Sequence, residues 1–302
     1  MRGDVKRSPL APGHALEYAL LRVVVAATGL LPEGAALAFG ARLGDLVRTI
    51  GIRREVTADN LAHAFPDLDE VARARILRDC YRELGRVAVE YPRIPDLVRR
   101  PDLYRVQGEE HLRSVAALER GVILLTGHYG NFELGGAWLS RVRPVDFVVK
   151  GMSNPAVEGW VTDLRRRSGI GQIPLGAGIR AVFAALETGR WVALLADQDA
   201  HEQGQFVPFF GRPASTPRGP AEIAVRRRVP ILMGFPERRA NGERVLTVLP
   251  PLWPRTDVED PVAELTGRHV ALLEARVREH PEHWLWLHRR WKTAPPAATG
   301  GG

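Results

Sequence analysis

The sequence contains a single cysteine, Cys80, among its 302 residues. This excludes an internal disulfide and any metal site built from several cysteines, and it favours a reducing compartment. Lysine is almost as rare, because only three of the 42 basic residues are lysines and the others are arginines. The net charge of +7 suits an anionic partner, and an arginine side chain can bind phosphate or carboxylate through two parallel hydrogen bonds.

Long apolar runs are also missing. The most apolar region, residues 15–50, is interrupted by Arg22 and by the Pro32-Glu33-Gly34 break, so no stretch of about 20 apolar residues could span a bilayer. The pattern predicts two helices at a membrane interface, where anionic head groups would meet the basic residues Lys6, Arg7, Arg22, Arg42 and Arg48. Two core helices of a soluble protein are an open alternative. No cleaved signal peptide is expected, since no small-residue cleavage site follows.

The rest of the chain has two kinds of pattern. Helical spacing runs from Arg53 to about Arg100, and afterwards short apolar runs alternate with amphipathic stretches. The apolar runs are 121–126, 145–150, 171–175, 191–197, 229–235 and 244–250. This alternation predicts an α/β sandwich with a mixed, mostly parallel sheet flanked by helices. The predicted domains are membrane-associating helices at 1–50, a catalytic domain at 51–293 and a disordered tail at 294–302.

A histidine and a glutamate stand directly after the first apolar run, in TGHYGNFE. If a strand ends at Thr126 and Asn131 caps the next helix, the side chains of His128 and Glu133 can converge at the strand's end. The helix dipole favours an ionised Glu133 in the first turn. We expect its carboxylate to accept the proton of one imidazole nitrogen, which leaves the other nitrogen free as a general base. A purely structural pair is the alternative.

These residues carry a resemblance to a known family. The sequence from His128 to Glu133 resembles the motif of glycerolipid-type acyltransferases, in which four residues separate a histidine from a glutamate after a buried strand. Further similar segments follow in order at 148–169, 191–200, 204–217, 229–239 and 280–292. From about Leu16 to Lys292 the chain is similar to the bacterial late acyltransferases of lipid A synthesis, the lauroyl and myristoyl transferases, and to the related phosphatidylinositol mannoside acyltransferases.

The resemblance implies transfer of a fatty acyl chain from acyl carrier protein, or from acyl-CoA, to a hydroxyl of a membrane glycolipid at the cytoplasmic face of the bacterial inner membrane. A lipid A precursor is the expected acceptor, while a phosphatidylinositol mannoside or an amino-acid lipid stays open. The implied site is a His128/Glu133 dyad without metal or other cofactor. The sequence has no G-x-S-x-G elbow and Cys80 lies in a predicted helix, so direct attack by the acceptor hydroxyl is expected.

The expected substrate contacts lie around this dyad. Arg165 and Arg167 align with paired arginines of the family, which implies that they hold a substrate phosphate or polarise the thioester carbonyl. A solvated helix end is their structural alternative. Lys150 stands where the family usually has arginine, so the positive charge is kept while the planar guanidinium, which makes two parallel hydrogen bonds, is lost. Asp197 and Gln198, at the end of the run WVALLA, are expected at the same sheet edge and, with Asn131, in the substrate site. Asp197 would orient an arginine there, and a simple turn cap is its structural alternative.

Three other patterns favour different functions. The segment 175–181, LGAGIRA, fits a loose dinucleotide motif with Asp197 about 20 residues later, but the preceding run is short and contains a proline. The basic clusters at 225–230 and 288–292 suit nucleic acid, although no nucleic-acid-binding signature accompanies them. The histidines in 280–288 lack a metal-binding spacing, and an amphipathic C-terminal helix is expected there instead.

Overall fold

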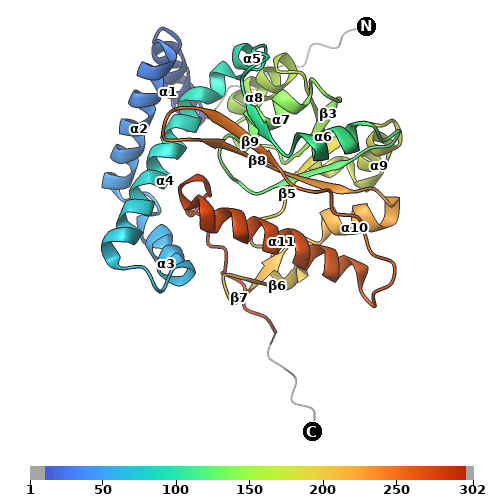
Figure 1. Ribbon diagram of the computed structural model, residues 1–302. Coiled ribbons are helices and arrows are strands. Elements are labelled where there is room, and N and C mark those ends of the chain that lie inside the picture. The colour runs from blue at the N-terminus through green and yellow to red at the C-terminus, as the bar shows by residue number, and fades with distance from the viewer. Residues whose placement is uncertain (1–10, 297–302) are drawn as a thin grey trace, which may run out of the picture.

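The computed structural model of the protein describes residues 11–296, and Figure 1 shows its arrangement. The predictions on Lys6, Arg7 and the last six residues of the tail lie outside the described residues. A seven-stranded sheet with the order β1-β9-β8-β2-β5-β3-β4 forms the centre, and β6 and β7 form a separate hairpin. The strands are β1 (Arg105–Gln107), β2 (Ile123–Thr126), β3 (Val145–Val149), β4 (Ile170–Pro174), β5 (Trp191–Leu195), β6 (Gln205–Phe209), β7 (Arg212–Thr216), β8 (Ile231–Arg238) and β9 (Arg244–Val248).

The helices fall on both faces of the sheet and along one side of it. They are α1 (Pro12–Gly29), α2 (Glu33–Ile50), α3 (Arg54–Ala64), α4 (Glu70–Glu90), α5 (Ile94–Leu97), α6 (Glu109–Ala116), α7 (Phe132–Leu139), α8 (Pro155–Arg167), α9 (Ile179–Glu187), α10 (Gly219–Arg227) and α11 (Pro261–Glu279). In Figure 1, α1, α2 and α4 stand together at the left, and α11 crosses in front of the sheet above the β6–β7 hairpin.

Alternation along the central strands separates two apolar cores. On β2, Ile123 and Leu125 belong to the core beneath α4, α9, α10 and α11, whereas Leu124 belongs to the core beneath α5, α6, α7 and α8. On β8, Met233 faces the first core and Leu232 the second. Successive side chains of a strand point to opposite faces of the sheet, so the two cores lie on its two faces. Helices cover both cores, and the sheet is therefore buried on both sides.

The predicted α/β architecture with a mostly parallel sheet is confirmed. The neighbours β8, β2, β5, β3 and β4 run parallel, and β9 is antiparallel to β8. Each of the six predicted apolar runs overlaps a strand. At the N-terminus, α1 and α2 meet at the predicted break before Glu33. Within residues 11–296, no helix has the length and hydropathy required to cross a bilayer.

Helix α2 packs directly on α4 through glycines. A Cβ added at Gly44 would lie 2.0 Å from the carbonyl oxygen of Tyr81, and one added at Gly85 would lie 2.0 Å from the carbonyl oxygen of Gly40. Such distances leave no room for a side chain, so the two backbones touch. Nearby, Arg93 just after α4 donates to the carbonyl oxygen of Thr28 in the last turn of α1 and to that of Leu31 in the turn before α2.

Two strand elements were not predicted from the sequence, and one predicted helix is absent. The segment after β5 forms the β6–β7 hairpin, in which Pro208 pairs with Pro213, and no strand was predicted there. The strand β1 was not predicted, because its three residues are too few to show a period. The expected amphipathic helix at the C-terminus is wrong: α11 ends at Glu279, and Trp284 and Trp286 of the following irregular segment are buried in the core.

Candidate active site

His128 and Asp197 lie side by side at the carboxyl ends of two parallel strands. Strands β2 and β5 pair so that Thr126 is opposite Leu195, and each functional residue follows two positions later. The imidazole Nδ1 of His128 lies 2.8 Å from Oδ1 of Asp197. The backbone N–H of His128 donates to Oδ2 of the same carboxylate at 2.7 Å, and Trp284 Nε1 donates to it at 2.9 Å. The aspartate therefore binds both the ring and the backbone of His128.

Charge at this pair favours the imidazolium. Burial acts to lower the pKa of His128, but the Asp197 charge and its hydrogen bond outweigh burial, so the pKa is raised above its usual 6.5. Burial likewise acts to raise the pKa of Asp197, but His128 and the donated hydrogen bonds hold it below its ordinary value. An ionised Asp197 can only accept, which assigns the proton to Nδ1 in the neutral ring and leaves Nε2 as the basic nitrogen.

Nε2 of His128 lies on the cavity side of the ring. The amide nitrogen of Gln198 is 3.4 Å from it, and both side chains line the same cavity. About a quarter of the His128 side chain is exposed, whereas Asp197 is almost completely buried. A hydroxyl that enters the cavity can therefore reach the basic nitrogen from the side opposite Asp197.

Glu133 has a different partner from the one expected. Its carboxylate accepts from Nε of Arg165 at 3.1 Å and also from Nη2, in a two-point ion pair between α7 and α8. Asn131 does cap α7 as predicted, since its Oδ1 accepts from Leu134 N at 3.0 Å. That cap directs the first turn of α7 toward α8. The hydrogen bond from His128 to Glu133 is thus a wrong expectation, while a catalytic role of Glu133 stays a prediction.

An apolar cavity of about 480 Å³ extends from these side chains between the sheet and α7. Four small residues are part of its wall, namely Gly135 and Gly136 of α7, Gly234 of β8 and Ala193 of β5. His128, Glu133 and Arg165 are in its wall together with many apolar side chains, including Leu124, Leu139, Phe147, Val149, Leu194, Leu232, Leu246 and Val248. The arrangement suits a ligand with a long apolar part and a polar reacting end.

The other predicted site residues divide into two groups. Lys150, which follows β3, and Gln198 line the cavity with His128. Asn131 and Arg167 are not in its wall. Both ends of the Asn131 amide are used by the cap and by Glu90, whose Oε2 accepts from Nδ2 at 2.8 Å. Arg167 is half exposed and pairs with Asp163 at 3.0 Å.

Sequence reasoning missed two residues that touch this machinery. Trp284 reaches Asp197 from the irregular C-terminal segment, and its neighbouring backbone pairs with the loop after β2, since Leu285 N donates to His128 O at 3.0 Å. Tyr91 lies beside the Glu133–Arg165 pair, where burial and the Glu133 carboxylate raise the pKa of its hydroxyl. Neither residue stands near the motif in the sequence, so only the fold could reveal them.

The alternative functions lose their main supports. The acid required for the dinucleotide reading is Asp197, which is occupied by His128 and Trp284. In the C-terminal basic cluster, Arg290 is buried and donates to Ser215 O and Thr216 Oγ1, so it serves the core. Cys80 is buried in α4, where burial raises the pKa of its thiol to about 12.

The fold and the site together define an α/β protein with an aspartate-bound histidine at an apolar cavity. The sequence profile of one family, described as bacterial lipid A biosynthesis acyltransferase, matches residues 5–293. The chain belongs to this family of acyltransferases.

Named relatives agree with that membership. The chain is 28% identical over 273 residues to the lipid A biosynthesis palmitoleoyltransferase of Escherichia coli (strain K12), which covers 88% of this chain and 87% of that protein. It is 28% identical over 274 residues to the lipid A biosynthesis lauroyltransferase of the same organism, with 88% of each chain covered. It is 29% identical over 219 residues to the phosphatidylinositol mannoside acyltransferase of Mycobacterium tuberculosis (strain CDC 1551 / Oshkosh), which covers 68% and 67%.

Proposed function

We propose that this protein transfers a fatty acyl chain from acyl carrier protein to a hydroxyl of a membrane glycolipid, most directly a lipid A precursor, on the cytoplasmic face of the inner membrane. One observation carries the proposal: the basic nitrogen of His128 lies at an apolar cavity of about 480 Å³, large enough to take an acyl chain. The names of the relatives supply the class of acceptor.

In the proposed reaction His128 acts as the general base. Nε2 removes the proton of the acceptor hydroxyl while its oxygen attacks the thioester carbonyl, and the negative charge of Asp197 stabilises the imidazolium that forms. Collapse of the tetrahedral intermediate breaks the C–S bond, and the imidazolium returns the proton to the leaving thiolate. The products are an ester and a free thiol, and His128 ends in its neutral starting form because it gives the thiolate the proton that it took from the hydroxyl.

No covalent acyl-enzyme is required in this scheme. The wall of the cavity contains neither serine nor cysteine among the described residues. Thr126 is the wall's hydroxyl residue, and its Oγ1 is buried without a hydrogen-bond partner in the described part of the chain. Direct attack by the acceptor therefore uses the groups that the site offers.

We assign to Arg165 the contact with the anionic or polarised part of the substrate, held in place by Glu133. Its guanidinium is largely buried, packs over the Phe147 ring and lines the cavity beside His128. A fixed fork of this kind can polarise a carbonyl or bind a phosphate in the transition state. Lys150, at the same wall, adds a second positive charge.

Replacing Arg165 with lysine is expected to reduce kcat/KM by about 10- to 100-fold, because the charge stays while the two-point contact is lost. Steady-state transfer assays measure the change. Arg190→Lys is the matched control, since Arg190 holds Asp146 in the same two-point geometry, with Nη2 2.6 Å from Oδ1, and does not line the cavity. Full activity of the Arg165→Lys enzyme would contradict the assigned contact.

The donor and the acceptor are tested separately. Lipid mass spectrometry of a deletion strain identifies the acceptor as the glycolipid that loses one acyl chain. Purified protein supplied with acyl carrier protein or coenzyme A thioesters of the same chain length identifies the donor, and we expect the carrier-protein thioester to react faster. Loss of an acyl chain from a phosphatidylinositol mannoside would instead favour the acceptor named for the mycobacterial relative.

Membrane association is proposed to use α1. Leu16, Leu20 and Val23 lie at helical spacing on this helix, and each is 59–65% exposed. An exposed apolar stripe at the end of a protein that acts on lipids suits the interface of a bilayer. The interaction of Asn154 with the carbonyl of His14 and the carboxylate of Glu17 fixes this helix against α8, whose last turn carries Arg165.

Serine at Leu16, Leu20 and Val23 together is expected to move the protein from the vesicle-bound to the free fraction in a flotation assay, with Tm nearly unchanged because these side chains are exposed. The matched control places serine at Val71, Val142 and Trp253, which are exposed apolar residues of other segments. Equal release of both variants, or of neither, would refute a specific role of α1.

A further inference from the structure

The loop that carries His128 is held from the side opposite the cavity. Tyr129 follows His128 directly, and its ring is fully buried in the core beneath α4 and α11. Its hydroxyl donates to Oε1 of Glu237 at 2.7 Å. The histidine and the tyrosine thus point to opposite sides of the loop: one reaches the cavity and the other anchors the backbone between them.

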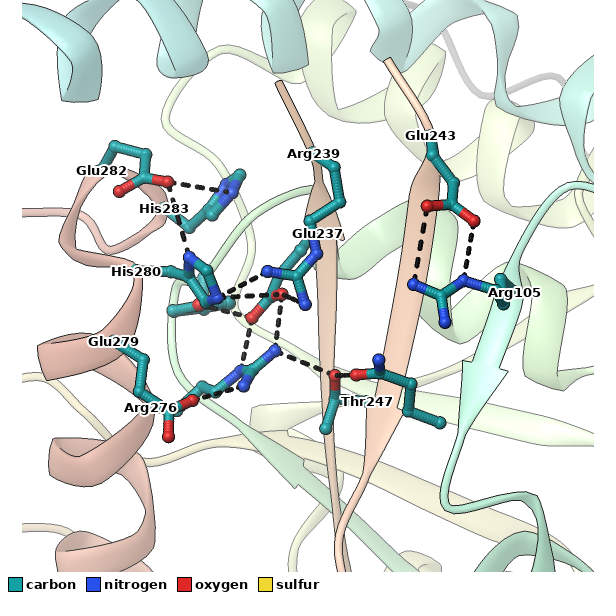
Figure 2. A network of polar contacts seen from close by, with 12 residues as sticks. Arg105, Glu237, Arg239, Glu243, Thr247, Arg276, Glu279, His280, Glu282 and His283 are labelled. Carbon is teal, nitrogen blue, oxygen red and sulfur yellow. Dashed lines mark hydrogen bonds and ion pairs between the residues drawn. The ribbon is translucent and has the colours of Figure 1, made fainter. Parts of the chain in front are cut away.

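Glu237 is a fixed point of the fold. It lies on β8 with a fully buried side chain, and Arg276 of α11 binds both of its carboxylate oxygens, with Nη2 2.6 Å from Oε2. Arg239 approaches Oε2 at 3.3 Å, and Thr247 of β9 accepts from Arg276 at 2.9 Å. Figure 2 shows Arg276 between Glu237 and Thr247, with Arg239 and His280 close by. The phenol of Tyr129 therefore meets an acceptor tied to two strands and a helix.

The backbone on either side of Tyr129 is also tightly confined. Gly130 N donates to His283 O at 2.8 Å, and Gly130 has a φ of +52° in the left-handed region. A Cβ at Gly130 would lie 1.9 Å from Pro236 O, so the loop passes directly over the strand that carries Glu237. Hence a displacement of the Tyr129 side chain would displace the backbone of His128 by a similar amount.

We propose that Tyr129, Glu237 and Arg276 are positioning residues that set the place of His128 relative to the acceptor hydroxyl. The proposal rests on the proposed role of His128 as general base. Asp197 fixes the tautomer and the rotation of the imidazole ring. The hydrogen bonds from Tyr129 and Arg276 to Glu237 fix the backbone of the loop on the side opposite the cavity. Burial and the Glu237 carboxylate raise the pKa of the Tyr129 hydroxyl, so this group stays a hydrogen-bond donor throughout the working pH range.

The test compares Tyr129→Phe with Tyr81→Phe in the full-length protein. Tyr81 is an equally buried tyrosine on α4, and its hydroxyl donates to Ile52 O at 2.6 Å, so both changes remove one buried hydroxyl without altering ring shape. We expect Tyr129→Phe to lower kcat by about 10- to 100-fold with little change in KM, because a misplaced base reacts slowly with a substrate that binds normally. Tyr81→Phe should keep the wild-type kcat, and both should lose a similar amount of Tm.

Two further readings separate positioning from general damage. Because Asp197 is untouched, the pH at which kcat/KM of Tyr129→Phe inflects should match that of wild type. In a double-mutant cycle, Tyr129→Phe and Glu237→Gln should be non-additive in kcat, since both interrupt one contact. Additive losses, or a kcat of Tyr129→Phe within twofold of wild type, would overturn the proposal while the proposed reaction itself remained observed.

A measurement without substrate keeps the inference independent of the reaction. Hydrogen exchange of the peptide covering residues 127–133 should be at least tenfold faster in Tyr129→Phe than in Tyr81→Phe under native conditions. Equal exchange in the two variants would refute the anchor even if wild type showed no acyl transfer. Absence of transfer in wild type, with faster exchange in Tyr129→Phe, would refute the proposed function and leave the anchor standing.

Discussion

Replacement of His128 with alanine should lower kcat/KM for acyl transfer by about 10²- to 10⁴-fold, the usual contribution of a general base. The ring supplies the basic nitrogen at the cavity, and no other histidine is among the residues that line it in the described chain. The side chain is partly exposed, so its loss should change Tm by only a few degrees. Steady-state transfer assays and thermal unfolding measure the two effects.

His111→Ala is the matched control for this variant. His111 lies on α6, is partly exposed, and pairs with Glu110 at 3.4 Å instead of a buried aspartate. The control should keep full activity. If His128→Ala retained activity within a few-fold of wild type, the general base would have to be another group and the proposed mechanism would fail.

Asp197→Asn should be nearly as damaging, with an expected loss on the order of 10²- to 10⁴-fold. Two N–H donors, from the His128 backbone and from Trp284 Nε1, converge on Oδ2. An asparagine must place its oxygen there, which turns its NH₂ group toward Nδ1 of the ring. The neutral imidazole is then protonated on Nε2, the nitrogen that should accept the proton.

Nuclear magnetic resonance of ¹⁵N-labelled histidine can verify that change of tautomer directly. Wild type should show Nδ1–H and a basic Nε2 above the pKa of the ring, and Asp197→Asn should show the reverse. An unchanged tautomer together with wild-type kcat/KM would contradict the role given to Asp197. Asp199→Asn is a useful comparison, because Asp199 binds Thr293 near the same strand end and does not touch His128.

The pH profile has a defined sign. Asp197 raises the pKa of His128 above 6.5, and the base is active only when neutral. In wild type, kcat/KM should therefore fall as the pH drops through a value above 6.5. Removal of the aspartate charge should move this inflection to lower pH in Asp197→Asn, and kcat/KM of the variant should be below that of wild type at every pH.

Much of the fold could be read from the sequence because its central strands are buried on both faces. Continuous apolar runs such as 191–195 stand out between amphipathic helices, and six of them were recognised. The β6–β7 hairpin was missed because prolines such as Pro208 and Pro213 are typical of loops. Proline has no backbone N–H to donate to a neighbouring strand, but in a two-stranded sheet each strand has a free edge, where this donor is not required.

The site was only partly predictable for a topological reason. The sequence places His128 and Asp197 after apolar runs, so both were expected at one edge of the sheet. Which carboxylate meets the imidazole depends on strand order, and β2 pairs with β5 although two strands intervene along the chain. Local spacing favoured Glu133, which is near in sequence; the capped helix turns it toward Arg165 instead.

The glycine contact between α2 and α4 has a consequence for how the molecule would sit on a bilayer. Rotamer changes of the side chains between two helices can accommodate small rolling or sliding movements, but at Gly44 and Gly85 no side chain separates the two backbones. Helix α2 is therefore held rigidly on α4, and α1 is attached to the same unit through Asn154 and through the contact of Arg93 with the turn between α1 and α2. If α1 lies in the interface, this attachment sets the distance and the orientation of the His128 cavity relative to the head groups. The acceptor hydroxyl then reaches the cavity by movement of the lipid and not by movement of the protein.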